Sequence, residues 1–390
     1  MQRLYFTLSI LVLASLLASC GATPTYEYVK VRETSAPTQA SQSPSDANNP
    51  YLNCLSPALK MNVGRAAHTA TLLPNGNVLI AGGFREEGTS EIAIASAEIF
   101  DPETNTFTPA GDMNEPRDGH TATLLPNGLV LIVGGWNQNG RTATAEIYDP
   151  ETGTFHYTGS LMTPRQGMTA NLLKNGQVLI SGGDSARNTP QLIAEIYDPS
   201  TQKFISTGEL NAGRMAHSAT LLDDGSVLLV GGASGEKVLA SAEMYNPNTG
   251  KFILAKDANE IRYKHSAVLM QDGTVLVIGG SNQNDWTGKY NSAEVYNPDT
   301  GEFTQTSDMN EERFKLADAA LLLSDGNVLI GGGNRIIEIF DSQTQRFIQG
   351  GVLDNDYYSS VSTLLENGSV LITGGYDPNI QPSDKAWLFC

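Results

Sequence analysis

The sequence is poor in cysteine, in positive charge and in long apolar segments. Its three cysteines are too few for a small fold held by many disulfides, and they form no Cys-x-x-Cys pair. Lysine and arginine total 24 against 42 aspartates and glutamates, a formal net charge of −18. Such an acidic surface repels phosphates, so nucleic acid is not expected as a partner. No Gly-x-Ser-x-Gly, His-Glu-x-x-His, phosphate-loop or calcium-loop motif is present, so the sequence predicts no catalytic residue, metal site or cofactor.

The longest apolar run lies at the start of the sequence. Arg3 precedes residues 4–17, which are too few to span a bilayer comfortably and are typical of an export signal. The next stretch, "LASC", resembles the bacterial lipobox, whose cysteine (here Cys20) is acylated and becomes the new N-terminus. The resemblance implies a lipid anchor in the bacterial cell envelope, facing an extracytoplasmic compartment, because several acyl chains attach stably. An ordinary signal peptide with an incidental Cys20 is the alternative.

The next segment, residues 21–50, is rich in Ser, Thr, Pro, Ala and Gln and has almost no apolar pattern. Such a composition buries too little surface to fold. We therefore expect three parts: a lipoprotein signal peptide over residues 1–20, a disordered tether over 21–50, and a folded domain over 51–390.

One unit is repeated seven times beyond residue 50. An apolar run ends in a double glycine at intervals of 42 to 53 residues, closing at Gly83, Gly135, Gly183, Gly232, Gly280, Gly333 and Gly375. An Asn-Gly or Asp-Gly pair precedes each run and favours a β-hairpin turn, because both turn residues need positive φ. Each unit is expected to hold four short strands, a to d. In the second unit these are predicted near residues 120–125, 130–133 and 145–148, and from Phe155 onward.

Four-stranded units at a period near fifty are typical of β-propeller blades. The sequence also resembles the kelch family. Its marks are Gly-Gly after strand b, Tyr-Asp-Pro or Tyr-Asn-Pro after strand c, and Met-x-x-x-Arg before the next strand a, as in "MNEPR" ending at Arg117. The resemblance covers residues 54–390 and implies an all-β, seven-bladed propeller with strand a innermost and strand d outermost. One departure is phenylalanine on strand d, where kelch blades usually carry tryptophan.

Seven copies of strands a, b and c are present, but only six copies of strand d follow them. The missing copy is at the front, where "CLSPALKMNVGR" from Cys54 aligns with "TFTPAGDMNEPR" from Thr106. We therefore expect the N-terminal strand to complete the last blade and close the ring, which removes open sheet edges. In this alignment Cys54 and Cys390 flank the place of the c–d turn, within disulfide range. A Cys54–Cys390 disulfide is expected, with two free thiols as the alternative.

The d–a loops carry one arginine in six blades and Tyr357 in the seventh; the arginines are Arg65, Arg117, Arg165, Arg214, Arg262 and Arg313. The kelch resemblance places these loops and the b–c loops at the mouth of the central channel. Arginines at the matching position in eukaryotic kelch adaptors bind acidic peptides, and a guanidinium suits a carboxylate. We therefore name these residues as candidate ligand contacts. A residue repeated in nearly every blade is more often an inter-blade hydrogen-bonding strut than a ligand contact.

A histidine follows three residues after four of the arginines, at His68, His120, His217 and His265, and Met168, Asp318 and Ser360 fill the matching places. Four imidazoles at one level could hold a metal ion. Because they repeat with the blades, we predict a structural role. The galactose-oxidase type of kelch enzyme holds copper with a Tyr-His pair and a cysteine-linked tyrosine. No tyrosine precedes these histidines, so that copper site is not expected.

The b–c loops vary in sequence, and variation on a repeated scaffold is where function is placed. Trp136 and Trp286, beside Asn and Gln, could present a flat apolar face to sugar rings or an extended peptide. We favour a monomeric, non-catalytic binding module for a protein or glycan ligand. The alternative is a carbohydrate-active enzyme, such as a sugar mutarotase or epimerase. Glu86, Glu87 or Asp285 beside two arginines in the channel would favour the enzyme.

Overall fold

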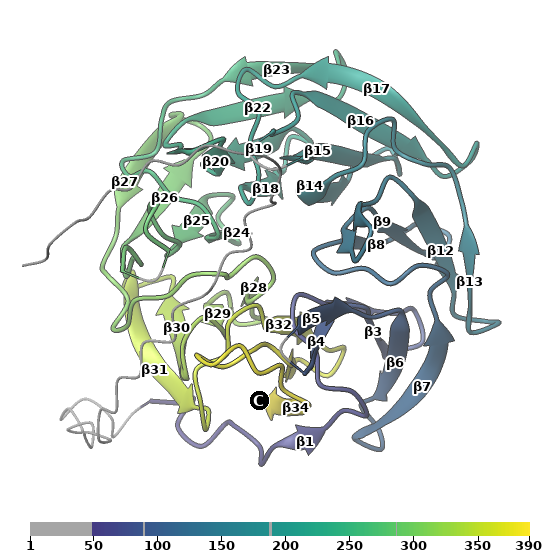
Figure 1. Ribbon diagram of the computed structural model, residues 1–390. Coiled ribbons are helices and arrows are strands. Elements are labelled where there is room, and N and C mark those ends of the chain that lie inside the picture. Colours follow the sequence, from purple (N-terminus) through teal and green to yellow (C-terminus); the bar gives the residue numbers. More distant parts are fainter. Residues whose placement is uncertain (1–48, 89, 187–188, 286) are drawn as a thin grey trace, which may run out of the picture. The chain divides into compact units, whose positions relative to one another are not determined.

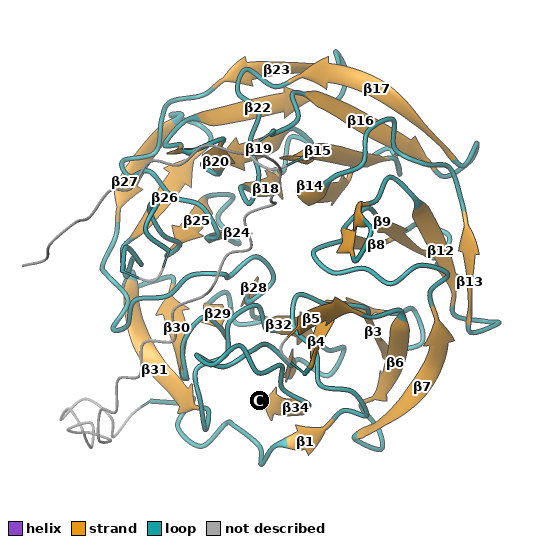
Figure 2. Ribbon diagram, in the orientation of Figure 1, coloured by secondary structure: helices purple, strands orange, loops and turns teal. Residues whose placement is uncertain are grey.

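The computed structural model describes residues 49–88, 90–186, 189–285 and 287–390. These residues form seven four-stranded antiparallel sheets, arranged as blades in a ring (Figure 1). Strands and loops account for all of the described residues (Figure 2). They contain no helix that is long and apolar enough to cross a membrane. The expected export signal, Cys20 and nearly all of the tether lie outside the described residues.

Each blade uses its four strands in the same order from the axis outward. The innermost strands, a, are β2 (Thr69–Leu72), β8 (Thr121–Leu124), β14 (Gln166–Leu172), β18 (Ser218–Leu221), β24 (Ser266–Leu269), β28 (Ala320–Leu322) and β32 (Val361–Leu364). The second strands, b, are β3 (Val78–Ala81), β9 (Val130–Val133), β15 (Val178–Asp184), β19 (Val227–Val230), β25 (Val275–Ile278), β29 (Val328–Ile330) and β33 (Val370–Thr373).

The two outer strands follow the same pattern. The third strands, c, are β6 (Ser96–Asp101), β12 (Ala145–Asp149), β16 (Ile193–Asp198), β22 (Ala242–Asn246), β26 (Ala293–Asn297), β30 (Ile336–Asp341) and β34 (Lys385–Phe389). The outermost strands, d, are β7 (Thr106–Asp112), β13 (Thr154–Tyr157), β17 (Lys203–Glu209), β23 (Lys251–Leu254), β27 (Glu302–Gln305), β31 (Arg346–Val352) and β1 (Leu59–Lys60). Three b–c loops form small hairpins, β4 (Phe84–Glu87) with β5 (Ser90–Ala93), β10 (Trp136–Asn137) with β11 (Gly140–Arg141), and β20 (Ala233–Ser234) with β21 (Lys237–Val238).

The core lies between neighbouring blades. Leu79 of β3, for example, packs in one cluster with Val130 and Ile132 of β9 in the next blade. Strand b is buried on both faces because sheets cover it from both sides, which is why it has no polar alternation. Farther out, Tyr148 of strand c faces Phe155 of strand d, with ring centroids 4.8 Å apart. Phenylalanine thus fills the site where tryptophan was expected from the family pattern.

The double glycine lies where two other backbone segments come very close to it. Gly82 and Gly83 have φ values of 61° and 90°, a region that disfavours residues with a Cβ. A Cβ at Gly82 would lie 2.6 Å from the Arg117 carbonyl oxygen of the next blade. A Cβ at Gly83 would lie 2.5 Å from the Ala66 carbonyl oxygen of its own blade. The repeated pair therefore lets each blade touch the following one.

The ring closes as predicted. Strand β1 pairs with β34, so the last sheet has the order β1-β34-β33-β32 and joins both ends of the folded chain (Figure 1). Leu55 bridges Phe389 just as Phe107 pairs with Phe100 in the first blade. Cys54 and Cys390 form a disulfide with Cα atoms 5.0 Å apart, at the place of the absent c–d turn.

Candidate functional site at the channel and its mouth

The six repeated arginines lie inside the blades and not on a surface open to ligands. All six are 0 or 1 % exposed. In the second blade, Arg117 donates to the Gly134 carbonyl at 2.7 Å and to Glu146 Oε1 at 2.8 Å. The other five make the same two contacts within their own blades. The structure therefore corrects their assignment as candidate ligand contacts and supports a structural role, although these contacts of the arginine side chains brace their own blades and do not bridge neighbouring ones.

The partner of each arginine is a glutamate of strand c, which the sequence pattern contains but which we did not single out. These are Glu98, Glu146, Glu195, Glu243, Glu294 and Glu338, each 1 % exposed or less. Glu146 also accepts from the backbone N–H and side-chain amide of Asn114, so it fixes the d–a loop as well. The sequence signal that could have identified these glutamates is the Glu of the repeated "AEIYDP" stretch. Arg-Glu pairs at this depth need their hydrogen bonds to offset desolvation.

Tyr357 takes the arginine position of the seventh blade and is also buried, at 4 % exposed. Its hydroxyl donates to Asp354 Oδ1 at 3.1 Å, and its ring packs on Trp387. A ligand contact is therefore not available to Tyr357 either. Trp136 is half-buried in the β10–β11 hairpin, and Trp286 lies outside the described residues.

The four histidines join neighbouring blades. His120 Nε2 lies 3.0 Å from Thr69 Oγ1, and His265 Nε2 lies 2.8 Å from Ser218 Oγ, each across a blade boundary. His68 and His217 make equivalent contacts with Thr373 and Thr169. Burial, reinforced by the nearby arginines, lowers the pKa of His120 and of His265 to about 3, so both rings are neutral at physiological pH. No group of three or more metal-ligating side chains occurs among the described residues.

The residue before each histidine position forms a ring of backbone hydrogen bonds around the mouth, which we call the girdle. It consists of Ala67, Gly119, Gly167, Ala216, Lys264, Lys315 and Ser359, all with positive φ. Gly119 N–H donates to the Ala67 carbonyl, Ala216 to Gly167, and the other blades continue the circuit. Only in the sixth blade does the following residue, Leu316, donate to the Lys264 carbonyl. The girdle brings seven residues, five of them with side chains, to one level of the mouth.

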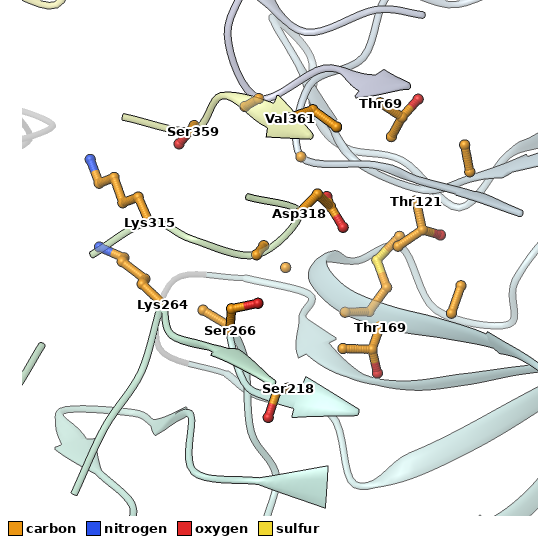
Figure 3. A pocket seen from close by; sticks show the side chains of 18 of the residues that line it. Thr69, Thr121, Thr169, Ser218, Lys264, Ser266, Lys315, Asp318, Ser359 and Val361 are labelled. Atoms are coloured by element: carbon orange, nitrogen blue, oxygen red, sulfur yellow. The ribbon is translucent and has the colours of Figure 1, made fainter. Parts of the chain in front are cut away.

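The girdle is chemically uneven. Four consecutive blades contribute only Ala or Gly, whereas the fifth and sixth contribute Lys264 and Lys315. The Lys264 ammonium pairs with Asp285 and lies 4.6 Å from the centre of the Tyr263 ring. Lys315 donates to the Tyr376 hydroxyl, and burial with repulsion from Lys264 lowers its pKa to about 8. Figure 3 shows both lysines side by side and pointing the same way.

A buried aromatic cluster supports these lysines. Phe84, Tyr376, Tyr358 and Phe314 form a chain of ring contacts with centroids 5.2 to 5.8 Å apart. The Lys315 ammonium lies 4.8 Å from the Tyr376 ring centre, a favourable cation–π distance. In the d–a loop of the second blade, burial and the nearby Glu91, which also interacts with Lys315, raise the pKa of Asp118 to about 7. The mouth thus has a cationic sector in an otherwise acidic protein.

Below the girdle the inner strands enclose a cavity of about 610 Å³. Its wall is mostly Ala, Ser and Thr from the seven inner strands, together with the four neutral histidines. Asp318 is the only acidic residue among those that line it. Serine and threonine both donate and accept hydrogen bonds, so the wall suits a polar occupant.

Comparison with known families agrees with this architecture. A model of the kelch motif matches residues 65–114, 119–162 and 262–310. Each match runs from the start of one blade to its end or into the next d–a loop. Together with the seven four-stranded blades, these matches show that the chain belongs to the kelch-repeat β-propeller family. No curated protein matches the chain. A kelch propeller is consistent with a protein-interaction module.

Proposed function

We propose that the protein is a monomeric, non-catalytic binding module that holds a protein or glycan ligand at the loop face around the channel mouth. Acylation of Cys20 attaches it to a membrane of the bacterial cell envelope, and residues 21–50 act as the tether. The lipid anchor is its only membrane contact, and nucleic acid is not a partner. The Cys54–Cys390 disulfide supports an oxidising, extracytoplasmic setting.

The observation that carries this proposal is the uneven girdle. The fold requires a positive φ at this position in every blade, which Gly adopts without strain and which Ala, Ser and Lys adopt at a similar cost because all three carry a Cβ. The backbone therefore does not favour Lys264 and Lys315 over the Ala or Gly of the first four blades. A propeller does not need two adjacent lysines at its mouth. They are accounted for by a ligand that carries acidic groups, which an ammonium attracts.

The arginine and carboxylate groups that the enzyme alternative expects at the channel mouth do not lie together there. It requires arginine beside a carboxylate at the mouth, and the six repeated arginines are buried inside the blades. Glu86 and Glu87 are exposed on the β4–β5 hairpin, and Asp285 pairs with Lys264. These contacts favour binding over sugar chemistry at this face.

A glycan array and an acidic-peptide library test the proposal, with the full chain as the probe. Lys264→Ala with Lys315→Ala should weaken binding of the best ligand by about tenfold or more, since two charge-assisted contacts are lost. The matched control is Lys203→Ala with Lys251→Ala, which removes the same charge from the exposed outer strands β17 and β23. Equal affinity of both double variants, at equal thermal stability, would refute the loop-face site.

A further inference from the structure

The sixth blade differs from the others where its inner strand begins. Leu72, which pairs with Val78, stands seven residues after Arg65 (72 − 65 = 7). Leu322, which pairs with Val328, stands nine residues after Arg313 (322 − 313 = 9). Two extra residues therefore lie in this blade, where residues 317–319 form a turn. No other blade among the described residues has this insertion.

The insertion places a carboxylate in the channel. Leu316 takes the place of the histidine, because a Cβ at Gly279 would meet Leu316 Cδ1 just as one at Gly182 meets His217 Cε1. Asp318 therefore does not occupy the histidine position, which corrects the sequence alignment. Its side chain extends from the turn into the 610 Å³ cavity instead, among hydroxyl groups from other blades (Figure 3).

The Asp318 carboxylate makes no hydrogen bond or ion pair with any described residue. It is exposed to the space of the channel, and the protein around the channel desolvates its carboxyl and raises the pKa above the usual range. Thr121 Oγ1 and Ser360 Oγ, from residues of the same wall, also make no hydrogen bond to described residues, but both atoms are buried. The carboxylate of Asp318 is therefore the group of this wall that is open to a small polar ligand.

The charges around the cavity point to a cationic ligand. The four histidines are neutral, because burial holds their pKa values far below 6.5. Lys264 and Lys315 line the mouth end, where they contact Asp285 and Tyr376, and their ammonium groups point away from Asp318 (Figure 3). The inner wall therefore offers one negative charge in a field of hydroxyls. An ammonium complements the carboxylate, and hydroxyl groups complement Ser and Thr.

We propose that the channel binds a small hydroxylated amine of monosaccharide size, an amino sugar or amino alcohol, with its ammonium on Asp318. The cavity volume falls in the range of pockets for small molecules, about 300–1,000 Å³. The Ala and Gly positions of the girdle leave the entrance free of long side chains in four blades. Lys264 and Lys315 line the mouth of this same cavity, but Asp318 belongs only to the channel site, which does not depend on the function proposed for the loop face.

Isothermal titration of the full protein at neutral pH with glucosamine, N-acetylglucosamine and glucose tests the proposal. Glucosamine should bind about tenfold or more tightly than either neutral sugar, because only its ammonium pairs with the carboxylate. Asp318→Asn should abolish this preference. Asp299→Asn, which removes the same charge from an exposed c–d turn, should keep it.

Absence of glucosamine binding, equal binding of all three sugars, or an unchanged preference in Asp318→Asn would each overturn the proposal. A thermal melt of each variant confirms that it is folded. Binding of the loop-face ligand should be the same in Asp318→Asn as in the unaltered protein. The two sites can therefore fail independently of each other.

Discussion

Tyr357 and Trp387 pack their rings 5.2 Å apart in the seventh blade, at the positions where the other six blades hold an Arg-Glu ion pair. Both members of the pair are exchanged together, so neither a lone arginine nor a lone glutamate is buried there. The blade that is closed by the two ends of the folded chain thus uses an apolar contact where the continuous blades use a charged one. Buried ion pairs and well-packed apolar groups are often close in stability.

This relationship predicts strong coupling between the arginine and glutamate of one blade. In the fourth blade, Arg214 Nη2 lies 2.6 Å from Glu243 Oε1, and both side chains are fully buried. Arg214→Tyr alone should cost about 3–5 kcal/mol of unfolding free energy, because it leaves a buried carboxylate without its partner. Arg214→Tyr with Glu243→Trp, the pair of the seventh blade, should be more stable than that single variant. Urea denaturation measures both.

An exposed ion pair provides the control for the variants of the fourth blade. Lys256 of a d–a loop pairs with Glu302 of β27, but their side chains are 57 % and 52 % exposed. Lys256→Ala should change the unfolding free energy by no more than about 0.5 kcal/mol. A double variant in the fourth blade that is no more stable than Arg214→Tyr would show that the two positions do not act as a unit.

The second prediction concerns ring closure. The Cys54–Cys390 disulfide spans 336 residues, so chain entropy limits its contribution to about 6 kcal/mol. Cys54→Ser with Cys390→Ser should lower the unfolding free energy toward that limit. It should also speed amide exchange in β34, whose Leu388 N–H is bonded to Ser56 of the N-terminal segment. A reductant should destabilise the unaltered protein and leave the double variant unchanged; equal sensitivity of both would contradict the prediction.

The repeats predicted the scaffold well because every blade repeats the same local constraints. Strand b of the second blade was expected at residues 130–133, and β9 spans Val130–Val133. The arginines were harder to interpret. The sequence shows how the arginines are spaced but not how deeply they are buried. The partner of Arg117 is also distant in the sequence, 29 residues away on strand c. Asp318 was misaligned because it stands as far before the Asp-Gly turn as the histidines do, although the distance from Arg313 to that turn already contains the two extra residues.

The third prediction is a pH dependence from the inter-blade histidines. Burial, reinforced by Arg117, lowers the pKa of His120 from 6.5 to about 3. Between these values the unfolded chain binds one more proton at this site, so stability falls as the pH falls from about 6.5 toward 3. The slope is about 1.4 kcal/mol per pH unit for each such histidine. The unfolding free energy of His120→Gln should therefore depend less steeply on pH, by about 1.4 kcal/mol per pH unit.

Urea denaturation at pH 7, 6 and 5 checks the histidine slope. The informative quantity is the difference in unfolding free energy between the unaltered protein and His120→Gln, because the carboxylates titrate equally in both. Parallel stability curves would show that His120 gains a proton as readily in the folded state as in the unfolded chain.

The last prediction separates the two ways in which Asp318 could be held in the channel. Burial raises the pKa of its carboxyl in the folded state, so the folded protein retains this proton to higher pH than the unfolded chain does. The contribution of Asp318 to stability is therefore present below its unfolded pKa of about 3.9 and is lost as the pH rises through the folded value. Asp318→Asn should then be at least as stable as the unaltered protein at pH 7, and its advantage should disappear near pH 4.

Thermal midpoints at the two pH values measure this difference in stability, with Asp299→Asn as the exposed control. If Asp318→Asn proved less stable at pH 7, the carboxylate would stabilise the fold, which contradicts the prediction; equal or greater stability would show that the fold does not need this charge.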